Sequence, residues 1–247
     1  MDLQQFEKQI RMGQGETQVG TQERQWVTAL PALMRKVYTW MALALAITGF
    51  TAWGVANSPG ILNAIYGNQI VFWVIIIAEL AIVWGVSAAI NRISLTTATL
   101  LFVLYSFING ITMSFIFLAY TATSVAQVFF ITAGTFAAMS FVGYVTKMDL
   151  SKLGSILFMA LIGLIIATIV NLFIKSSGFA TILSYAGVLI FVGLTAWDTQ
   201  KIKLMLAEAD DTSEGAQKIA LLGALSLYLD FINLFLYLLR ILGRARD

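Results

Sequence analysis

Seven separate blocks of apolar residues, each long enough to cross a bilayer, constrain this chain more than any other feature. A membrane-spanning helix needs roughly 20 mainly apolar residues, and its backbone satisfies its own hydrogen bonds, as lipid surroundings require. The sequence therefore predicts an all-α integral membrane protein with seven transmembrane helices. The expected spans are 33–56, 70–90, 96–120, 124–146, 154–174, 179–200 and 217–241.

The composition agrees with a membrane protein and excludes several kinds of site. Of the 247 residues, 59% are hydrophobic and 11% are charged, whereas soluble domains carry about 25% charged residues. The chain contains no cysteine and no histidine, so disulfides, thiolate chemistry and zinc or haem sites built on those residues are excluded. The net charge of +2 is too small to suggest a nucleic-acid partner. We expect no cofactor.

Residues 1–31 differ in character from the rest of the chain. They are mostly polar and lack the basic, apolar and small-residue order of a cleaved signal peptide. We expect them to form a cytoplasmic tail, partly helical at best, that ends where Pro31 starts the first membrane helix. Residues 32–247 form the transmembrane domain in this interpretation.

The positions of lysine and arginine indicate the orientation, because cytoplasmic loops are enriched in both. With a cytoplasmic N-terminus, Lys175 is the basic residue left in the outer loops, and the remaining connections between spans place their basic residues inside. One conflict concerns the last segment, since seven crossings would export Arg240, Arg244 and Arg246. This segment either crosses or re-enters and returns; its length favours a crossing.

Four ionisable residues lie in or beside the apolar segments, where charge is costly and usually serves a function. Glu79 lies near the middle of the second span, Asp198 near the end of the sixth and Asp230 within the seventh, while Arg92 follows the second span. Each also has a plain structural interpretation. Glu79 could lock two helices together, and Arg92 could extend to lipid headgroups. Asp198 could be an interfacial carboxylate, and Asp230 could form a structural helix contact with Asn233.

The spacing of two aspartates predicts that they meet. Residue 214, midway between Asp198 and Asp230, falls in the turn-forming sequence Asp-Asp-Thr-Ser-Glu-Gly, so two antiparallel helices would bring the carboxyls level. Two close carboxylates in a low-dielectric site can share one proton and can bind Ca²⁺ through oxygen atoms. Asn233, three residues after Asp230, shares its helix face. Arg92 would end its helix on the same membrane face and could act as an ionic latch.

Several motifs together resemble the Bax inhibitor-1 (transmembrane BAX inhibitor motif) family, in particular its bacterial members. They are Arg35-Lys-Val-Tyr-Thr-Trp-Met41, Tyr105-Ser-Phe-Ile-Asn-Gly-Ile-Thr-Met-Ser114, Gly193-Leu-Thr-Ala-Trp-Asp198-Thr-Gln-Lys-Ile202 and Leu225-Ser-Leu-Tyr-Leu-Asp230-Phe-Ile-Asn-Leu-Phe235. The resemblance covers all seven spans.

The resemblance implies a bundle in the inner (plasma) membrane with the last helix at its centre, and a pH-sensitive calcium leak. It implies that Asp198 and Asp230 form the pH sensor and gate, that Arg92 latches to Asp198, and that Glu79 and Asn233 lie on the ion path. The long separation of the two aspartates implies either an extended sixth helix or a longer loop around 206–215.

Two alternatives to an ion leak share some of these sequence features. Some bacterial relatives are regarded as modulators of a membrane-anchored ATP-dependent protease, and the tail could serve such a partner. An intramembrane aspartyl protease also places one aspartate on each of two helices, but it carries Gly-x-Gly-Asp, whereas Leu227-Tyr-Leu precedes Asp230. We therefore expect no enzymatic activity. The bilayer and calcium ions are the expected partners.

Overall fold

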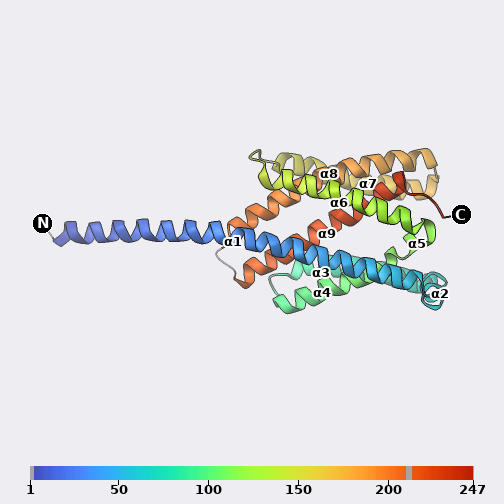
Figure 1. The fold of residues 1–247 in the computed structure, drawn as a ribbon, viewed down its shortest axis with the longest axis horizontal. Coiled ribbons are helices and arrows are strands. Elements are labelled where there is room, and N and C mark those ends of the chain that lie inside the picture. Colours follow the sequence, from blue (N-terminus) through green and yellow to red (C-terminus); the bar gives the residue numbers. More distant parts are fainter. Residues whose placement is uncertain (1–2, 210–212, 247) are drawn as a thin grey trace.

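The computed structural model describes residues 3–209 and 213–246, with side chains described from residue 30 onward. The described chain is helical almost throughout, and seven of its helices are long and apolar enough to cross a membrane. The fold is therefore the all-α, multi-pass membrane fold that the apolar blocks predict (Figure 1). The helices are α1 (Leu3–Ala56), α2 (Pro59–Tyr66), α3 (Gln69–Ala89), α4 (Leu95–Met113), α5 (Phe115–Ala119), α6 (Ala122–Val145), α7 (Ser151–Ile174), α8 (Ser177–Ala207) and α9 (Glu214–Leu242).

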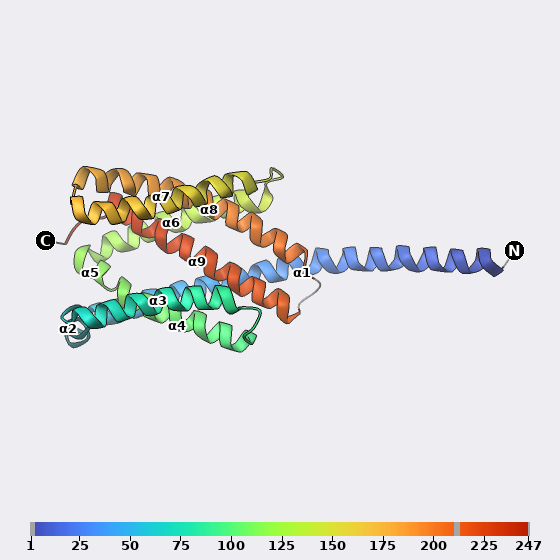
Figure 2. The ribbon, with the colours of Figure 1, turned by 180° about the vertical axis from the view of Figure 1, so that it is seen from behind.

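The last helix, α9, lies at the centre of the bundle. Buried residues make up 67% of its apolar stretch, against 6% in α3 and in α7. It packs against α1, α4, α6 and α8, whereas α3 packs mainly on α4 and α7 mainly on α8. Figure 2 shows α9 crossing the middle of the molecule between these two groups of helices. The expected central position of the last helix is confirmed.

The first helix differs from the expectation. It runs without a break from Leu3 to Ala56, and Pro31 lies inside it rather than at its start. The prediction of a tail that is partly helical at best was therefore wrong for the backbone. Proline removes a single backbone donor, and a helix that continues on both sides of it tolerates that loss.

The connection between the first two spans contains a short helix and is not a plain turn. Ser58 and Pro59 start the short helix α2, with proline at the first helical position, where its missing N–H costs nothing.

The expected third span is divided at Ser114 into α4 and α5. The sixth span is the extended alternative, since α8 continues to Ala207.

One end of the bundle carries more basic side chains than the other, where Lys175, Arg240, Arg244 and Arg246 lie. We call the end that carries Arg35, Lys36, Arg92, Lys147, Lys152 and Lys203 the basic end. The long N-terminal part of α1 leaves the bundle there, and the C-terminus lies at the opposite end (Figure 1). The helix α9 thus runs the full length of the bundle, as a crossing requires. Beyond α9, the backbone of Arg244 and Arg246 pairs with Thr121 and Ala119 beside the α5–α6 corner.

Candidate functional site

A cavity of about 780 Å³ brings together the acidic residues that the sequence singled out. Glu79 from α3, Asp198 from α8, and Asp230 and Asn233 from α9 all line it. The cavity lies between the two outer helices α3 and α7 and the inner helices α8 and α9. Asp230 and Asn233 therefore share one face of α9, and Asn233 donates to the Leu229 carbonyl of its own helix at 2.8 Å.

The packing of α8 against α9 places the two aspartates side by side. The helix α8 ends at Ala207 and α9 begins at Glu214, and the two helices pack against each other along their length, so residues at similar distances from these ends lie level. The carboxyl groups of Asp198 and Asp230 lie within hydrogen-bonding reach of each other. Asp230 is 5% exposed, while Asp198 is half-buried on the cavity wall.

The hydrogen bonding of this pair has a chemical consequence. Oδ2 of Asp230 is buried and finds no donor among the described residues, although the Asp198 carboxyl is its neighbour. Two deprotonated carboxylates have no hydrogen to exchange, and a buried acceptor without a donor is costly. One proton held between the two carboxyls would supply the missing hydrogen bond.

The cation next to Asp198 is not the expected one. Lys201 lines the same cavity and attracts the Asp198 carboxylate, while its Nζ lies 4.9 Å from the centre of the Trp197 ring. Arg92 is exposed at the basic end and does not line the cavity. Within the described chain the ion pair formed is Lys218 with Glu214, at 3.0 Å. The structure therefore does not bring Arg92 to Asp198, and its role as a latch stays a prediction.

Glu79 has buried polar partners on α4. Its carboxylate accepts a hydrogen bond from the Thr112 hydroxyl and lies within reach of the Asn109 side chain. Asn109 Oδ1 accepts from the Tyr228 hydroxyl of α9 at 2.9 Å. That hydroxyl also lies 2.6 Å from Thr48 Oγ1 of α1. A continuous polar chain thus links Glu79 to the first helix through the buried core.

A second polar cluster lies next to Thr112, the hydrogen-bond partner of Glu79. The hydroxyl of Tyr66, on α2, donates to the carbonyl of Thr112 at 3.0 Å and lies 3.1 Å from Ser114 Oγ. Ser114 stands where α4 ends and α5 begins, so the helix break exposes carbonyls to this hydroxyl. Glu79 therefore faces the large cavity and is joined through Thr112 to the Tyr66–Ser114 pair, which we call the cover.

The sequence did not identify Lys201, Tyr66, Thr48 or Tyr228 as parts of this region. The four-residue spacing of Ser106, Gly110 and Ser114 predicts a row of small residues that packs closely against another helix. Gly110 does serve packing, since an added Cβ would lie 2.7 Å from the Thr48 carbonyl. Asn109 and Tyr228 are polar residues inside apolar spans, and this feature of the sequence could have identified the buried polar chain.

The site offers carboxylates for a cation but no dense metal site. Among residues 30–209 and 213–246, no three Asp, Glu, Cys or His side chains gather as a metal-binding group. Ca²⁺ takes six to eight oxygen ligands when tightly held. Three carboxyls and the Asn233 amide line the large cavity without gathering into such a ligand set.

Comparison with known proteins places this arrangement in context. The sequence model described as "Inhibitor of apoptosis-promoting Bax1" matches residues 30–247. The chain is 50% identical to inner membrane protein YbhL of Escherichia coli over 219 residues, which cover 88% of this chain and 93% of that protein. An uncharacterized protein of Borreliella burgdorferi is 44% identical over 92% of this chain and 98% of its own length. An uncharacterized membrane protein of Streptococcus pyogenes is 37% identical over 85% and 91%.

Proposed function

The chain belongs to the Bax inhibitor family of multi-pass membrane proteins, and from this premise we propose that it is a pH-sensitive cation leak, with Ca²⁺ as the cation transported. The observation that carries the proposal is the Asp198–Asp230 pair, which lines a large cavity together with Glu79. The proposal assigns proton sensing to the pair. It has no catalytic step and needs no resident cofactor.

The proposed gate works through the charge of the pair. With one shared proton, the two carboxyls bond each other, which ties α8 to α9. Loss of that proton leaves two like charges side by side, whose repulsion separates the carboxyls and exposes oxygen ligands to the cavity. Lys201 and Asn233 line the same cavity and set the local charge and polarity that an entering cation meets.

The proposed path continues from this cavity to Glu79 and then to the cover of Tyr66 and Ser114. Cytoplasmic loops of membrane proteins are enriched in lysine and arginine. The residues of the basic end therefore support a cytoplasmic location for that end and for the N-terminus. The Escherichia coli relative is an inner membrane protein by name, which supports the same membrane for this chain.

Calcium flux into liposomes that hold the purified full chain tests the proposal. Flux is measured at pH 6, 7 and 8 for the wild type, Asp198→Asn and Asp230→Asn. We expect the wild-type flux to change with pH and both variants to lose that change, because an amide cannot share the proton. Asp149→Asn is the matched control, since Asp149 is an exposed carboxylate outside the bundle.

Two results would overturn the proposal. One is absence of flux in the wild type at every pH, in protein whose helical content and monodispersity show it to be folded. The other is an unchanged pH profile in both cavity variants. Modulation of a membrane-anchored protease, the alternative expected from the resemblance, stays a prediction.

A further inference from the structure

A groove between α1 and α6 opens toward the membrane on the side of the bundle away from the acidic cavity. The helix α1 packs mainly on α4 and α9, whereas α6 packs mainly on α8 and α9. The two helices therefore flank α9 with space between them. Three connected hollows fill this space, of about 260, 580 and 580 Å³.

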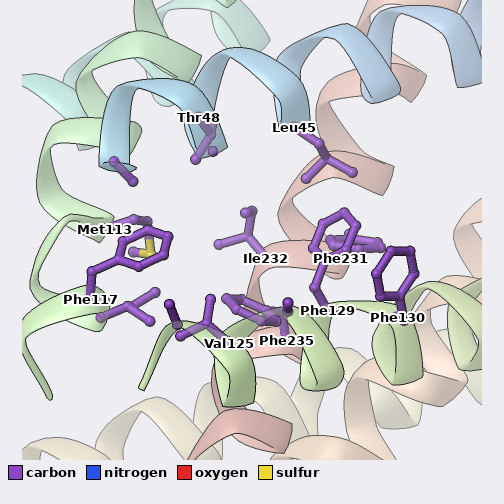
Figure 3. Close-up of a pocket in the computed structure, with 15 residues that line it drawn as sticks. Leu45, Thr48, Met113, Phe117, Val125, Phe129, Phe130, Phe231, Ile232 and Phe235 are labelled. Carbon is purple, nitrogen blue, oxygen red and sulfur yellow. The ribbon is translucent and has the colours of Figure 1, made fainter. Parts of the chain in front are cut away.

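The hollows form one continuous groove along α1. The hollow nearest the basic end shares Ala42 with the middle one, and the middle one shares Leu45, Gly49 and Phe129 with the innermost. Phe231 of α9 forms part of the floor, with its ring centre 5.4 Å from that of Phe129. Figure 3 shows the innermost hollow enclosed by side chains of α1, α4–α5, α6 and α9.

The lining of the innermost hollow suits a hydrocarbon chain. Of its lining residues, Thr48 carries the one polar side chain, and that hydroxyl is already engaged by Tyr228 and the Ser106 carbonyl. A polar or charged ligand would lose its hydration there without gaining partners. An acyl chain loses nothing, because it leaves one apolar environment for another.

The mouth of the groove at the basic end carries positive charge. Arg35 lines it, is exposed, and forms no ion pair or hydrogen bond with the residues that the structure describes. Tyr144, also in the lining, is covered by Lys203, whose Nζ bonds the Tyr144 carbonyl at 2.7 Å. No carboxylate lines this described mouth. Basic pockets between membrane helices bind anionic lipid headgroups.

The dimensions fit one lipid of the leaflet at the basic end. Ten helical residues separate Arg35 from Leu45, or about 15 Å at 1.5 Å per residue, which is half of a hydrocarbon core of about 30 Å. A phosphate at Arg35 therefore places its acyl chain along Ala42 and Leu45, with the chain end reaching the hollow of Figure 3.

From these observations we propose that the α1–α6 groove is a binding site for one anionic phospholipid, with its phosphate at Arg35 and an acyl chain in the hollow over α9. The site gives a role to Arg35, Tyr38 and Met41 of the first-span motif, all of which line the groove. It is independent of the cation path, which lies on the other side of α9.

Native mass spectrometry of the full chain in detergent tests the site, with phosphatidylglycerol and phosphatidylcholine as probes. We expect one phosphatidylglycerol to bind more tightly than phosphatidylcholine. Arg35→Gln should weaken phosphatidylglycerol about tenfold, the usual effect of losing one charge-assisted hydrogen bond, and weaken phosphatidylcholine less, because the choline ammonium already offsets the charge of its phosphate. Lys152→Gln, which removes an exposed charge at the same end but outside the groove, is the control and should change neither.

A second pair of variants tests the acyl chain. Gly49 lines the two inner hollows and an added Cβ there meets nothing within 4 Å, so Gly49→Phe fills the groove without a backbone clash. It should weaken both lipids, whereas Gly54→Phe, whose Cβ is equally free but outside the groove, should weaken neither. Ala42→Phe serves if Gly49→Phe does not fold, because Ala42 is exposed in the groove.

The proposal is overturned if the wild type binds both lipids equally, or if Arg35→Gln and the groove-filling variants bind phosphatidylglycerol as the wild type does. Equal weakening by Lys152→Gln and Arg35→Gln would also overturn it, because the attraction would then belong to the whole basic end.

Discussion

Replacing Tyr228 by phenylalanine tests the buried polar chain that joins α1, α4 and α9. The Tyr228 side chain is fully buried, and its ring packs edge-on against Phe102 and Tyr105 at 6.0 and 5.8 Å between centres. Phenylalanine preserves those ring contacts and removes the hydroxyl alone. The change in stability therefore reports the hydrogen bonds.

The number of hydrogens available fixes which bond matters. Three contacts run from Thr48 Oγ1 to the Ser106 carbonyl, from Thr48 Oγ1 to the Tyr228 hydroxyl, and from that hydroxyl to Asn109 Oδ1. Two hydroxyl hydrogens serve them, so two of the three bonds form at once. When Tyr228 donates to Asn109, Thr48 donates either to Tyr228 or to the Ser106 carbonyl.

This arrangement predicts unequal costs for the two hydroxyls. Tyr228→Phe leaves Asn109 Oδ1 buried without its donor, which costs about 1–3 kcal/mol in proteins generally. Hydrogen bonds between membrane helices average about 0.6 and reach about 1.7 kcal/mol, so we expect a loss of about 1–2 kcal/mol. Thr48→Val leaves the Tyr228–Asn109 bond intact and should cost less than about 1 kcal/mol.

Reversible unfolding by SDS in mixed micelles measures these free energies. Tyr185→Phe is the control, because Tyr185 is 56% exposed and its hydroxyl has no partner in the described structure; it should leave the free energy of unfolding unchanged. A Thr48→Val cost equal to or above that of Tyr228→Phe would refute the reasoning, since Tyr228 would then donate to Thr48.

Two further predictions concern helix packing and a helix start. Gly143→Ala would place a Cβ 2.1 Å from the Ala196 carbonyl oxygen of α8. Thermal unfolding should therefore show a loss of about 1–3 kcal/mol in the free energy of unfolding. Gly134→Ala on the same helix, where an added Cβ meets nothing within 4 Å, should leave that free energy unchanged. The pKa of the exposed Asp149 is held below its ordinary value by hydrogen bonds from the Ser151 hydroxyl and backbone N–H and by Lys152, so this support for the start of α7 is present above about pH 4 and lost as the pH falls below that. NMR titration should give the depressed pKa, and Ser151→Ala should raise it; an unchanged value would contradict the assignment.

The sequence was sufficient for the spans because each is a long apolar run, and a long run in lipid has few alternatives to a helix. The sequence was insufficient where a short motif is compatible with two local structures. The sequence Ser58-Pro59 is typical both of a turn and of a helix start, and here it starts α2. Gly13, Gly15 and Gly20 argue against a helix, yet α1 contains all three.

The site shows the same division. The meeting of Asp198 and Asp230 was predictable because both lie about equally far from one turn. Lys201 was missed because its charge already had an explanation in membrane orientation. The bond between Thr48 and Tyr228 joins residues 180 positions apart, and nothing in either helix indicates which hydroxyl across the bundle is its partner.

The backbone pairing of the C-terminus with the α5–α6 corner makes α9 a strut fixed at both ends. At one end the Leu95 N–H at the start of α4 donates to the Glu214 carboxylate at 3.3 Å, and at the other the Thr121 N–H donates to the Arg244 carbonyl at 3.1 Å and the Arg246 N–H to the Ala119 carbonyl at 3.0 Å. A strut fixed in this way cannot slide along its axis without carrying the corner with it. Any motion that parts α9 from α8 must therefore be a tilt or a bow about these anchors, largest near mid-length, where Asp230 lies.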